Sequence, residues 1–363
     1  MSGELTSPDP HKIKHIFRWD LDKTYLATDF DSLSSLLRIP FESAEEKVNV
    51  PGAAALLQCL TGATAVADES AVYFISGSPQ QMETVLREKL ALDGIAYHSL
   101  SLKPNLKNLT RGRFRAIKEQ VGYKLPLLLE GRIDYLPGTT ETLFGDDAES
   151  DGFIYALYGA YMAGRVPWSV IEAVFEECRV YDDAAEAARN ARNNLILDDC
   201  VETIFINLDR KSSPARFSRF SKRIVPIYNY WQAALVLQSK GRLSAGGSLL
   251  VAGKLQDTYG YTLPRLRNSV EDLLRRQHLT RDSLAGITES LTKLSPERDH
   301  QNMLDMLTQL VDKPPPVLRR PDEDVPTSPE DYIELFRAEK AARKAAKHAV
   351  MQVRKETDRE EQA

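Results

Sequence analysis

Residues 17–30 read FRWDLDKTYLATDF, and this stretch decides how the rest of the chain is interpreted. The preceding residues 13–19, IKHIFRW, are rich in Ile, Phe and Trp and predict a buried strand. Because side chains alternate along a strand, Asp20 and Asp22 should lie on one side of its carboxyl end. Two carboxylates this close repel each other unless a cation or a proton lies between them. By itself the Asp-Leu-Asp pattern is most often a solvated turn, so the other segments must show whether these two aspartates belong to a functional site.

The bulk composition narrows the class of protein. With 363 residues, 42% hydrophobic and 27% charged, the chain can form two domains with a substantial core. The net charge of −5 provides no overall basic field for nucleic acid. The start, MSGELTSPDPHK, lacks the features of a secretory signal, and no apolar run approaches the roughly 20 residues that span a bilayer. Cys59, Cys178 and Cys200 are sparse, which predicts a reducing, cytoplasmic location and no zinc site.

Residues 11–150 alternate between strand and helix patterns, which predicts an α/β fold with a mostly parallel sheet. The expected strands cover residues 12–20, 71–76, 97–102 and 140–144, and the expected helices cover 51–60, 79–90, 113–121 and 124–135. After residue 151 the pattern is helical, with helices expected at 153–164, 167–178, 182–194, 224–241, 249–259, 263–277, 281–291 and 299–311. The segment 201–209, VETIFINLD, is ambiguous and can be an added strand, and residues 1–10 are expected to be disordered.

These patterns predict four parts of the chain. An α/β domain covers residues 11–165, an all-helical domain 166–311, a proline-rich linker 312–327, and a charged terminal helix and tail 328–363. Ser328 as the cap and Pro329 at the first position indicate where the last helix begins. We expect that helix to be solvated or packed on a partner rather than to bind membrane or RNA.

Two further segments place polar groups where a site at the strand ends needs them. FISGSP puts Ser76 at the carboxyl end of the second expected strand, followed by Gly77 and a helix. A hydroxyl, free backbone amides and a helix N-terminus together form a seat for an anion. Lys124 stands at the start of an expected helix and can reach over the sheet edge toward the same anion. Each signal alone is weak, since most lysines are simply exposed.

The stretch TLFGDDAESDGFIY places Asp146, Asp147 and Asp151 after a further strand. A cluster of acids at a strand end is unfavourable unless it holds a cation, and hard oxygen ligands with open positions suit Mg²⁺. In open α/β sheets, ligands bind in the crevice outside the carboxyl ends of the strands. The order and placement of the four segments therefore predict one shared site.

The four segments together resemble the motifs of the haloacid dehalogenase superfamily of phosphohydrolases. In this chain they read Asp20-Leu21-Asp22-Lys23-Thr24, then Ser76-Gly77-Ser78, then Lys124, and last Gly145-Asp146 with Asp151. The resemblance covers residues 12–160 and implies a Rossmann-like haloacid dehalogenase fold, followed by the all-helical C-terminal domain.

A narrower resemblance is to the catalytic domain of the actin-patch type of phosphatidate phosphatase and its uncharacterised bacterial relatives. It is carried by DLDKTYLATDF, PGAAALLQCL, YFISGSP, YKLPLLLEGR and FGDDAESDGFIY. Asp147 stands where that family has a serine, so either Asp147 or Asp151 can complete the metal site. The resemblance does not extend over residues 165–363.

The resemblance implies a Mg²⁺-dependent phosphomonoester phosphatase. Asp20 would be the nucleophile that forms an aspartyl-phosphate, and Asp22 the general acid and base. Ser76 and Lys124 would bind the phosphoryl oxygens. The implied Mg²⁺ ligands are Asp20, the backbone carbonyl of Asp22, Asp146 and either Asp151 or Asp147.

The substrate depends on what covers the site. The segments 27–49 and 97–123 are the places for a cap and are short, which favours a bulky substrate such as a lipid head group, a protein or a nucleic-acid end, unless the C-terminal helices fold over the site. The basic run 210–223 can receive a phosphorylated substrate or an anionic membrane surface. That run can equally be a solvated loop. Two alternatives stay open: a catalytically silent binding or scaffold protein of this fold, and a phosphatase of nucleic-acid ends, which the acidic charge disfavours. The pattern does not indicate an oligomeric state.

Overall fold

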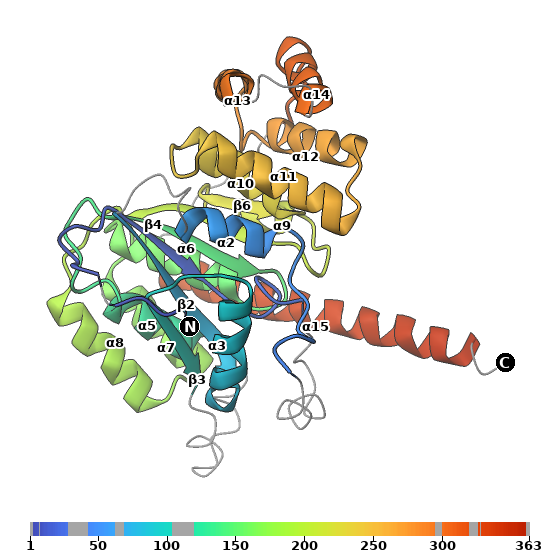
Figure 1. Cartoon of the computed structure of the whole chain (residues 1–363). Coiled ribbons are helices and arrows are strands. Elements are labelled where there is room, and N and C mark those ends of the chain that lie inside the picture. Colours follow the sequence, from blue (N-terminus) through green and yellow to red (C-terminus); the bar gives the residue numbers. More distant parts are fainter. Residues whose placement is uncertain are drawn as a thin grey trace.

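The computed structural model describes residues 3–6, 8–27, 43–61, 69–103, 120–294, 300–318, 326 and 328–360. Within these residues, one six-stranded sheet forms the centre of the molecule, with the order β3-β2-β1-β4-β5-β6 (Figure 1). All five strand pairs are parallel. The strands are β1 (His15–Trp19), β2 (Ser70–Pro79), β3 (Ser99–Lys103), β4 (Thr140–Asp146), β5 (Val201–Asn207) and β6 (Ile224–Ile227). The predicted α/β class with a parallel sheet is confirmed.

The strand order determines where a ligand can enter the sheet. From β1 the chain adds β2 and then β3 on one side, and it returns to place β4 on the other side of β1. The connections that follow β1 and β4 therefore leave in opposite directions, which opens a crevice at the carboxyl ends of these two strands. Asp20 directly follows β1, and Asp146 is the last residue of β4.

One face of the sheet is covered by the helices that follow β1 and β2 and by most of the C-terminal helices. Phe17, Trp19, Phe74 and Phe144 lie in this apolar cluster, and Trp19 stacks on Phe144 with ring centroids 3.8 Å apart. The helices are α2 (Ala53–Thr61), α3 (Glu83–Leu92), α10 (Tyr230–Ser239), α11 (Ala245–Tyr259), α12 (Leu263–Arg275), α13 (Arg281–Leu294) and α14 (Gln301–Asp312), with the short 3₁₀ turn η2 (Gln80–Met82) before α3. Among these helices, α13 and α14 lie farthest from the sheet in Figure 1.

The other face is covered by a second apolar cluster, to which Leu143 and Ile204 contribute from the sheet. Its helices are α5 (Val121–Glu130), α6 (Asp151–Met162), α7 (Trp168–Cys178), α8 (Asp182–Asn194), the single turn α9 (Ala215–Ser218) and the start of α15 (Pro329–Glu360). Tyr332 and Phe336 of α15 pack against Phe153 of α6. The distal part of α15 extends away from the rest of the molecule (Figure 1).

Residues 201–227 add two strands that the apolar pattern did not distinguish from helix. Within the ambiguous segment 201–209, Val201–Asn207 form β5. The helix expected over 224–241 is wrong in its first residues, because Ile224–Ile227 form β6 and the helix begins at Tyr230. Short apolar runs buried on both sides have no clear period, so they fit a helix or a buried strand equally well. The sheet thus continues into the part expected to be helical, and the division into domains stays a prediction.

The N-terminal residues that are described are ordered, contrary to expectation. Leu5 donates its backbone N–H to the carbonyl of Tyr97 at 2.7 Å, and Tyr97 donates to the carbonyl of Gly3 at 3.0 Å. The polar composition of this segment therefore did not predict disorder correctly for these residues, because their backbone is paired with that of Tyr97.

Several expectations fall outside the described residues: most of both cap segments, most of the helix expected at 113–121, and part of the linker at 312–327. Cys59, Cys178 and Cys200 are buried, and no disulfide joins any two of them. Among the described helices, none combines the length and apolar character needed to cross a bilayer.

Candidate active site

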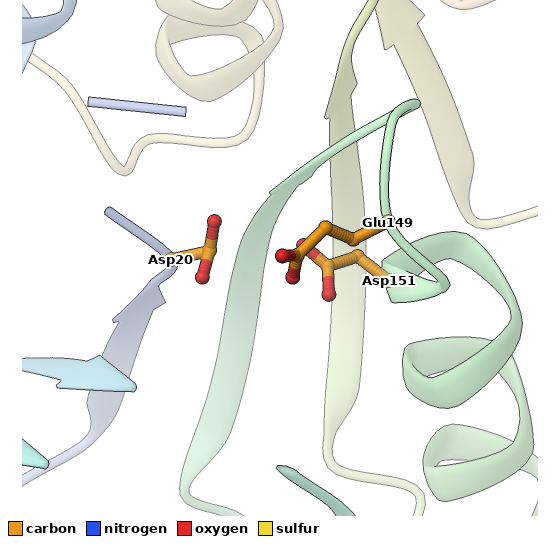
Figure 2. Close-up of side chains that lie close together, drawn as sticks. All are labelled: Asp20, Glu149 and Asp151. Carbon is orange, nitrogen blue, oxygen red and sulfur yellow. The ribbon is translucent and has the colours of Figure 1, made fainter. Parts of the chain in front are cut away.

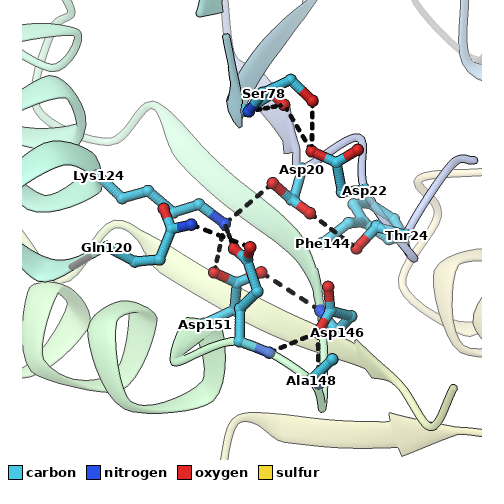
Figure 3. A network of polar contacts seen from close by, with 12 residues as sticks. Asp20, Asp22, Thr24, Ser78, Gln120, Lys124, Phe144, Asp146, Ala148 and Asp151 are labelled. Atoms are coloured by element: carbon cyan, nitrogen blue, oxygen red, sulfur yellow. Dashed lines mark hydrogen bonds and ion pairs between the residues drawn. The ribbon is translucent and has the colours of Figure 1, made fainter. Parts of the chain in front are cut away.

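Asp20 continues the pairing of β1 with β4 and is fully buried. Its backbone N–H donates to the carbonyl of Phe144 at 2.9 Å, which extends the ladder of the sheet by one residue. The Thr24 hydroxyl donates to Asp20 Oδ2 at 3.3 Å. Asp20 is therefore held from the backbone by the sheet and from its side chain by the turn that follows (Figure 3).

That turn is fixed by contacts from distant parts of the chain. Lys23 lies in the left-handed region with φ 60°, and its N–H donates to the carbonyl of Leu26 at 2.7 Å. The Asn207 side chain at the end of β5 donates to the carbonyl of Lys23 at 2.7 Å. The Tyr230 hydroxyl of α10 donates to the carbonyl of Thr24 at 2.5 Å. The C-terminal half of the chain thus holds the loop that carries both aspartates.

Asp22 faces the end of β2. Its Oδ2 accepts from the hydroxyls of Ser76 at 3.1 Å and Ser78 at 2.5 Å, whereas its buried Oδ1 has no hydrogen-bond partner among the described residues. Burial raises the pKa of the Asp22 carboxyl to about 6, against the opposing effect of the two serine hydroxyls. A carboxyl with this pKa is half protonated near pH 6 and still partly protonated at neutral pH, so it can both give and take a proton.

Lys124 joins three acidic side chains from two segments of the chain. It lies in the first turn of α5, and its side chain is 0% exposed. The ammonium Nζ is 2.9 Å from Asp20 Oδ1, 2.5 Å from Asp151 Oδ1 and 3.1 Å from Glu149 Oε2. Figure 3 shows the lysine reaching between Asp20 and the loop that follows β4.

The loop from β4 to α6 is closed by hydrogen bonds to and from Asp146. Asp146 Oδ1 accepts the N–H groups of Ala148 at 2.5 Å and Glu149 at 2.8 Å, which closes a tight turn. The Asp146 N–H donates to Asp151 Oδ2 at 3.3 Å. The second carboxylate oxygen of Asp146, Oδ2, is buried and has no partner among the described residues.

Gly145 makes room for the Asp151 side chain. A Cβ atom added at Gly145 would lie 2.5 Å from both Cβ and Oδ2 of Asp151, closer than non-bonded atoms approach. The carboxylate of Asp151 can lie beside Lys124 only because residue 145 has no side chain.

We expect Gly145→Ala to displace Asp151 and to lower the phosphomonoester hydrolysis that the family resemblance implies about 10-fold to 100-fold, because supporting contacts of this kind position the reacting groups. Gly253→Ala is the matched control, because a Cβ at Gly253 in α11 meets no atom within 4 Å. The measurement is kcat with a chromogenic phosphomonoester for both variants. Equal kcat values would show that the tight packing at Gly145 has no part in activity.

The electrostatics of the cluster favour a further cation. The carboxylates of Asp20, Glu149 and Asp151 surround the Lys124 ammonium, and Asp146 lies beside Asp151, so within this cluster of described residues the acids outnumber the one lysine. Burial raises the pKa of Asp20, Asp146 and Asp151, and the neighbouring acids raise it further, whereas Lys124 opposes the rise. Burial alone would lower the pKa of Lys124, but Asp151, Asp20 and Glu149 outweigh it and keep the ammonium charged.

The residues present fit a divalent metal. Oxygen atoms of Asp20, Glu149 and Asp151 lie within 4.8 Å of one another, as Figure 2 illustrates. The unpartnered oxygens Asp146 Oδ2 and Asp22 Oδ1 add two buried acceptors nearby. An all-oxygen set of this kind is typical of Mg²⁺. The buried acidic cluster could therefore hold a metal ion.

The residues singled out in the sequence meet at this edge of the sheet. Asp20, Lys124 and Asp151 are in direct contact, Asp22 and Ser76 are hydrogen-bonded to each other, and Asp146 borders Asp151. Asp147 differs, because its Oδ1 accepts the N–H of Arg210 at 2.8 Å and its Oδ2 that of Ser212 at 2.9 Å. Of the two alternatives for the last metal ligand, Asp151 is the one beside Lys124. The catalytic and metal-binding roles themselves stay predictions.

Three residues of the site were not assigned from the sequence. Glu149 lies in the acid-rich stretch after β4, and the number of acids in that stretch is the signal that could have pointed to it. Ser78 belongs to the same motif as Ser76, but the resemblance implies a role for Ser76 alone. Gln120 donates to Glu149 Oε1 at 2.9 Å and lies over Gly77, where an added Cβ would be 2.5 Å from its Nε2. No local pattern marks Gln120, because its contact partners are remote along the chain.

The parallel sheet, with a buried cluster of acids and a lysine at the carboxyl ends of β1 and β4, defines a Rossmann-like α/β protein with a candidate active site at its topological switch point. Residues 19–172 match the family model described as phosphatidate phosphatase APP1, catalytic domain. This match confirms the resemblance to the actin-patch-type phosphatidate phosphatase catalytic domain, and it spans all four motifs. Searches of curated proteins and of solved structures find no match.

Proposed function

We propose that this chain is a Mg²⁺-dependent phosphomonoester phosphatase that acts through an aspartyl-phosphate on Asp20 and takes a phosphatidate-type lipid as its substrate. The observation that carries the proposal is the contact of Lys124 with both Asp20 and Asp151, which joins the first, third and fourth motifs in one buried cluster. The matched family supports the reaction type and the substrate class.

In the first step, an oxygen of the Asp20 carboxylate attacks phosphorus while the bond from phosphorus to the leaving oxygen breaks. The Asp22 carboxyl, held by Ser76 and Ser78, gives its proton to that leaving oxygen. In the second step, Asp22 takes a proton from water, the water oxygen bonds to phosphorus, and the bond to Asp20 breaks. The products are the alcohol and inorganic phosphate, and both aspartates return to their starting state.

The other residues support charge and position. The Lys124 ammonium neutralises oxygens of the phosphoryl group as well as Asp20, and the Ser76 hydroxyl is the second phosphoryl-binding group. Asp20, Asp146, Asp151 and the backbone carbonyl of Asp22 would hold Mg²⁺. When bound, the metal reduces repulsion between Asp20 and the phosphate and polarises the phosphoryl group.

The reaction type is tested by removing the metal. With a chromogenic phosphomonoester and Mg²⁺, we expect steady hydrolysis that EDTA stops and excess Mg²⁺ restores, because four carboxylates crowd the phosphate site when the metal is absent. Hydrolysis that EDTA leaves unchanged would contradict metal dependence. Absence of hydrolysis of this and a broader panel of phosphomonoesters would contradict the phosphatase itself.

The substrate class needs a separate comparison. Phosphatidate in mixed micelles and a water-soluble phosphomonoester are offered at equal concentrations, and kcat/KM is measured for each. We expect phosphatidate to be preferred, and sedimentation with liposomes that contain anionic lipid should show binding. A preference for the soluble ester, without binding to the liposomes, would contradict a lipid substrate while leaving the phosphatase intact.

A further inference from the structure

The C-terminal helix α15 is tied to the region beside the candidate active site by one buried ion pair. Arg216 of α9 donates from Nε to Glu339 Oε2 at 3.0 Å, and its Nη2 donates to Glu339 Oε1. The Arg216 side chain is 12% exposed and the Glu339 side chain 3%. Buried pairs with two parallel hydrogen bonds define geometry more strictly than surface pairs do.

The same guanidinium contacts the loop that follows β4. Arg216 Nη1 donates to the hydroxyl of Ser212 at 2.8 Å and to the backbone carbonyl of Asp147 at 3.4 Å. The Asp147 carboxylate in turn accepts the N–H groups of Arg210 and Ser212. Glu339, Arg216 and Asp147 therefore form a continuous chain of polar contacts from α15 to the residue that follows Asp146.

Every polar group of Asp147, in its backbone and its side chain, makes a hydrogen bond. Its N–H donates to the carbonyl of Asn207 at 3.0 Å, in addition to the contacts of its carbonyl and carboxylate. The next two N–H groups, of Ala148 and Glu149, are the ones that donate to Asp146 Oδ1. The orientation of the Asp146 carboxylate thus depends on where the peptide of Asp147 is fixed.

We propose that Arg216 and Glu339 are positioning residues of the active site, through which α15 holds the 146–151 loop so that Glu149 and Asp151 contact Lys124 and Asp146 lies beside Asp151. The consequence for hydrolysis rests on the proposed function, whereas the consequence for the loop does not. In this arrangement α15, which lies outside the matched residues 19–172, helps to hold the active-site loop that lies within them.

The chain offers a matched control on the same helix. Arg337 of α15 donates from Nη2 to Glu177 Oε2 of α7 at 2.7 Å, and this pair lies at the surface, with side chains 66% and 27% exposed. It ties α15 to α7. If the Arg216–Glu339 pair only attaches α15, its loss should affect the 146–151 loop no more than loss of the Arg337–Glu177 pair does. If it positions the loop, a change at Glu339 should affect the loop and a change at Arg337 should not.

Hydrogen exchange of the full-length protein tests the loop directly. We expect Glu339→Gln to speed exchange of the Ala148 and Glu149 amides about 10-fold or more, because the turn at Asp146 opens more often. Arg337→Gln should leave both amides at the wild-type rate. Equal exchange at Ala148 and Glu149 in the two variants would overturn the proposal.

A second variant avoids leaving Arg216 buried and unpaired. In Arg216→Met/Glu339→Leu, apolar side chains replace both charges, so the protein should fold with a near wild-type Tm. We expect the same faster exchange, a Mg²⁺ affinity lowered roughly 10-fold to 100-fold in calorimetric titration, and a lower kcat with an almost unchanged substrate KM. Wild-type exchange and Mg²⁺ affinity in this folded variant would overturn the proposal. Absence of phosphatase activity in the wild-type protein would contradict the proposed function. The exchange experiment does not depend on activity and would still test the role of the ion pair.

Discussion

Asp20→Asn is expected to lower kcat for a phosphomonoester by about 10⁴-fold or more, while the protein keeps its fold. Loss of a covalent nucleophile produces effects of this order in other enzymes, and the residual rate then reflects binding and the remaining groups. Asparagine has the size of aspartate and can still accept a hydrogen bond from Lys124 through its carbonyl oxygen, so packing is preserved. Single-turnover phosphate release and thermal unfolding measure the two halves of this prediction.

The control for Asp20→Asn is the same substitution at an exposed site. Asp305 lies on α14 and is exposed, so Asp305→Asn should keep the wild-type kcat. Trapping with acid should detect phosphoryl-enzyme in the wild type and none in Asp20→Asn. A wild-type rate in Asp20→Asn would remove Asp20 from the mechanism and with it the assignment of the other groups.

Arg18→Met is expected to lower the free energy of unfolding by roughly 3–5 kcal/mol, because it leaves a buried carboxylate without its main partner. Arg18 Nε is 3.0 Å from Glu141 Oε2, and the two side chains are 3% and 0% exposed. Arg18 also donates to the carbonyl of Gly131 at 2.8 Å, which links β1 to the end of α5. Equilibrium unfolding in urea measures the loss.

The double variant Arg18→Met/Glu141→Leu separates the pair from its surroundings. Replacing both charges with apolar side chains should recover most of the lost stability. Recovery should be incomplete, because the Tyr158 hydroxyl, which donates to Glu141 Oε2 at 3.0 Å, loses its acceptor. Equal losses in the single and double variants would mean that the unpaired carboxylate is not the cause of the instability.

Most of the candidate site could be predicted because its residues occupy places that local patterns mark. Asp20 and Ser76 follow apolar runs of strand character, and Lys124 lies in the first turn of a helix. Parallel strands bring such positions to one edge of a sheet whatever the intervening loops do. The contact of Lys124 with Asp20 and Asp151 was therefore accessible from spacing together with the family resemblance.

The parts that were missed depend on contacts across long stretches of chain. Asp147 and Glu149 are neighbours in one acidic run, yet one carboxylate binds the 210–212 backbone and the other binds Lys124. Which way each acid turns depends on partners 25 to 65 residues away along the chain. Similarly, β6 was read as helix because four apolar residues carry no period of their own.

The sequence by itself determined the α/β character of the chain and the types of group at its strand ends, because apolar periodicity and strand-end polarity are local properties. Only the tertiary structure decided which acids face Lys124, that β5 and β6 complete the sheet, and that Glu339 reaches the 146–151 loop through Arg216. The physical reason is that the direction of a charged side chain is set by the partners that compensate its burial, and those partners are brought near only by folding.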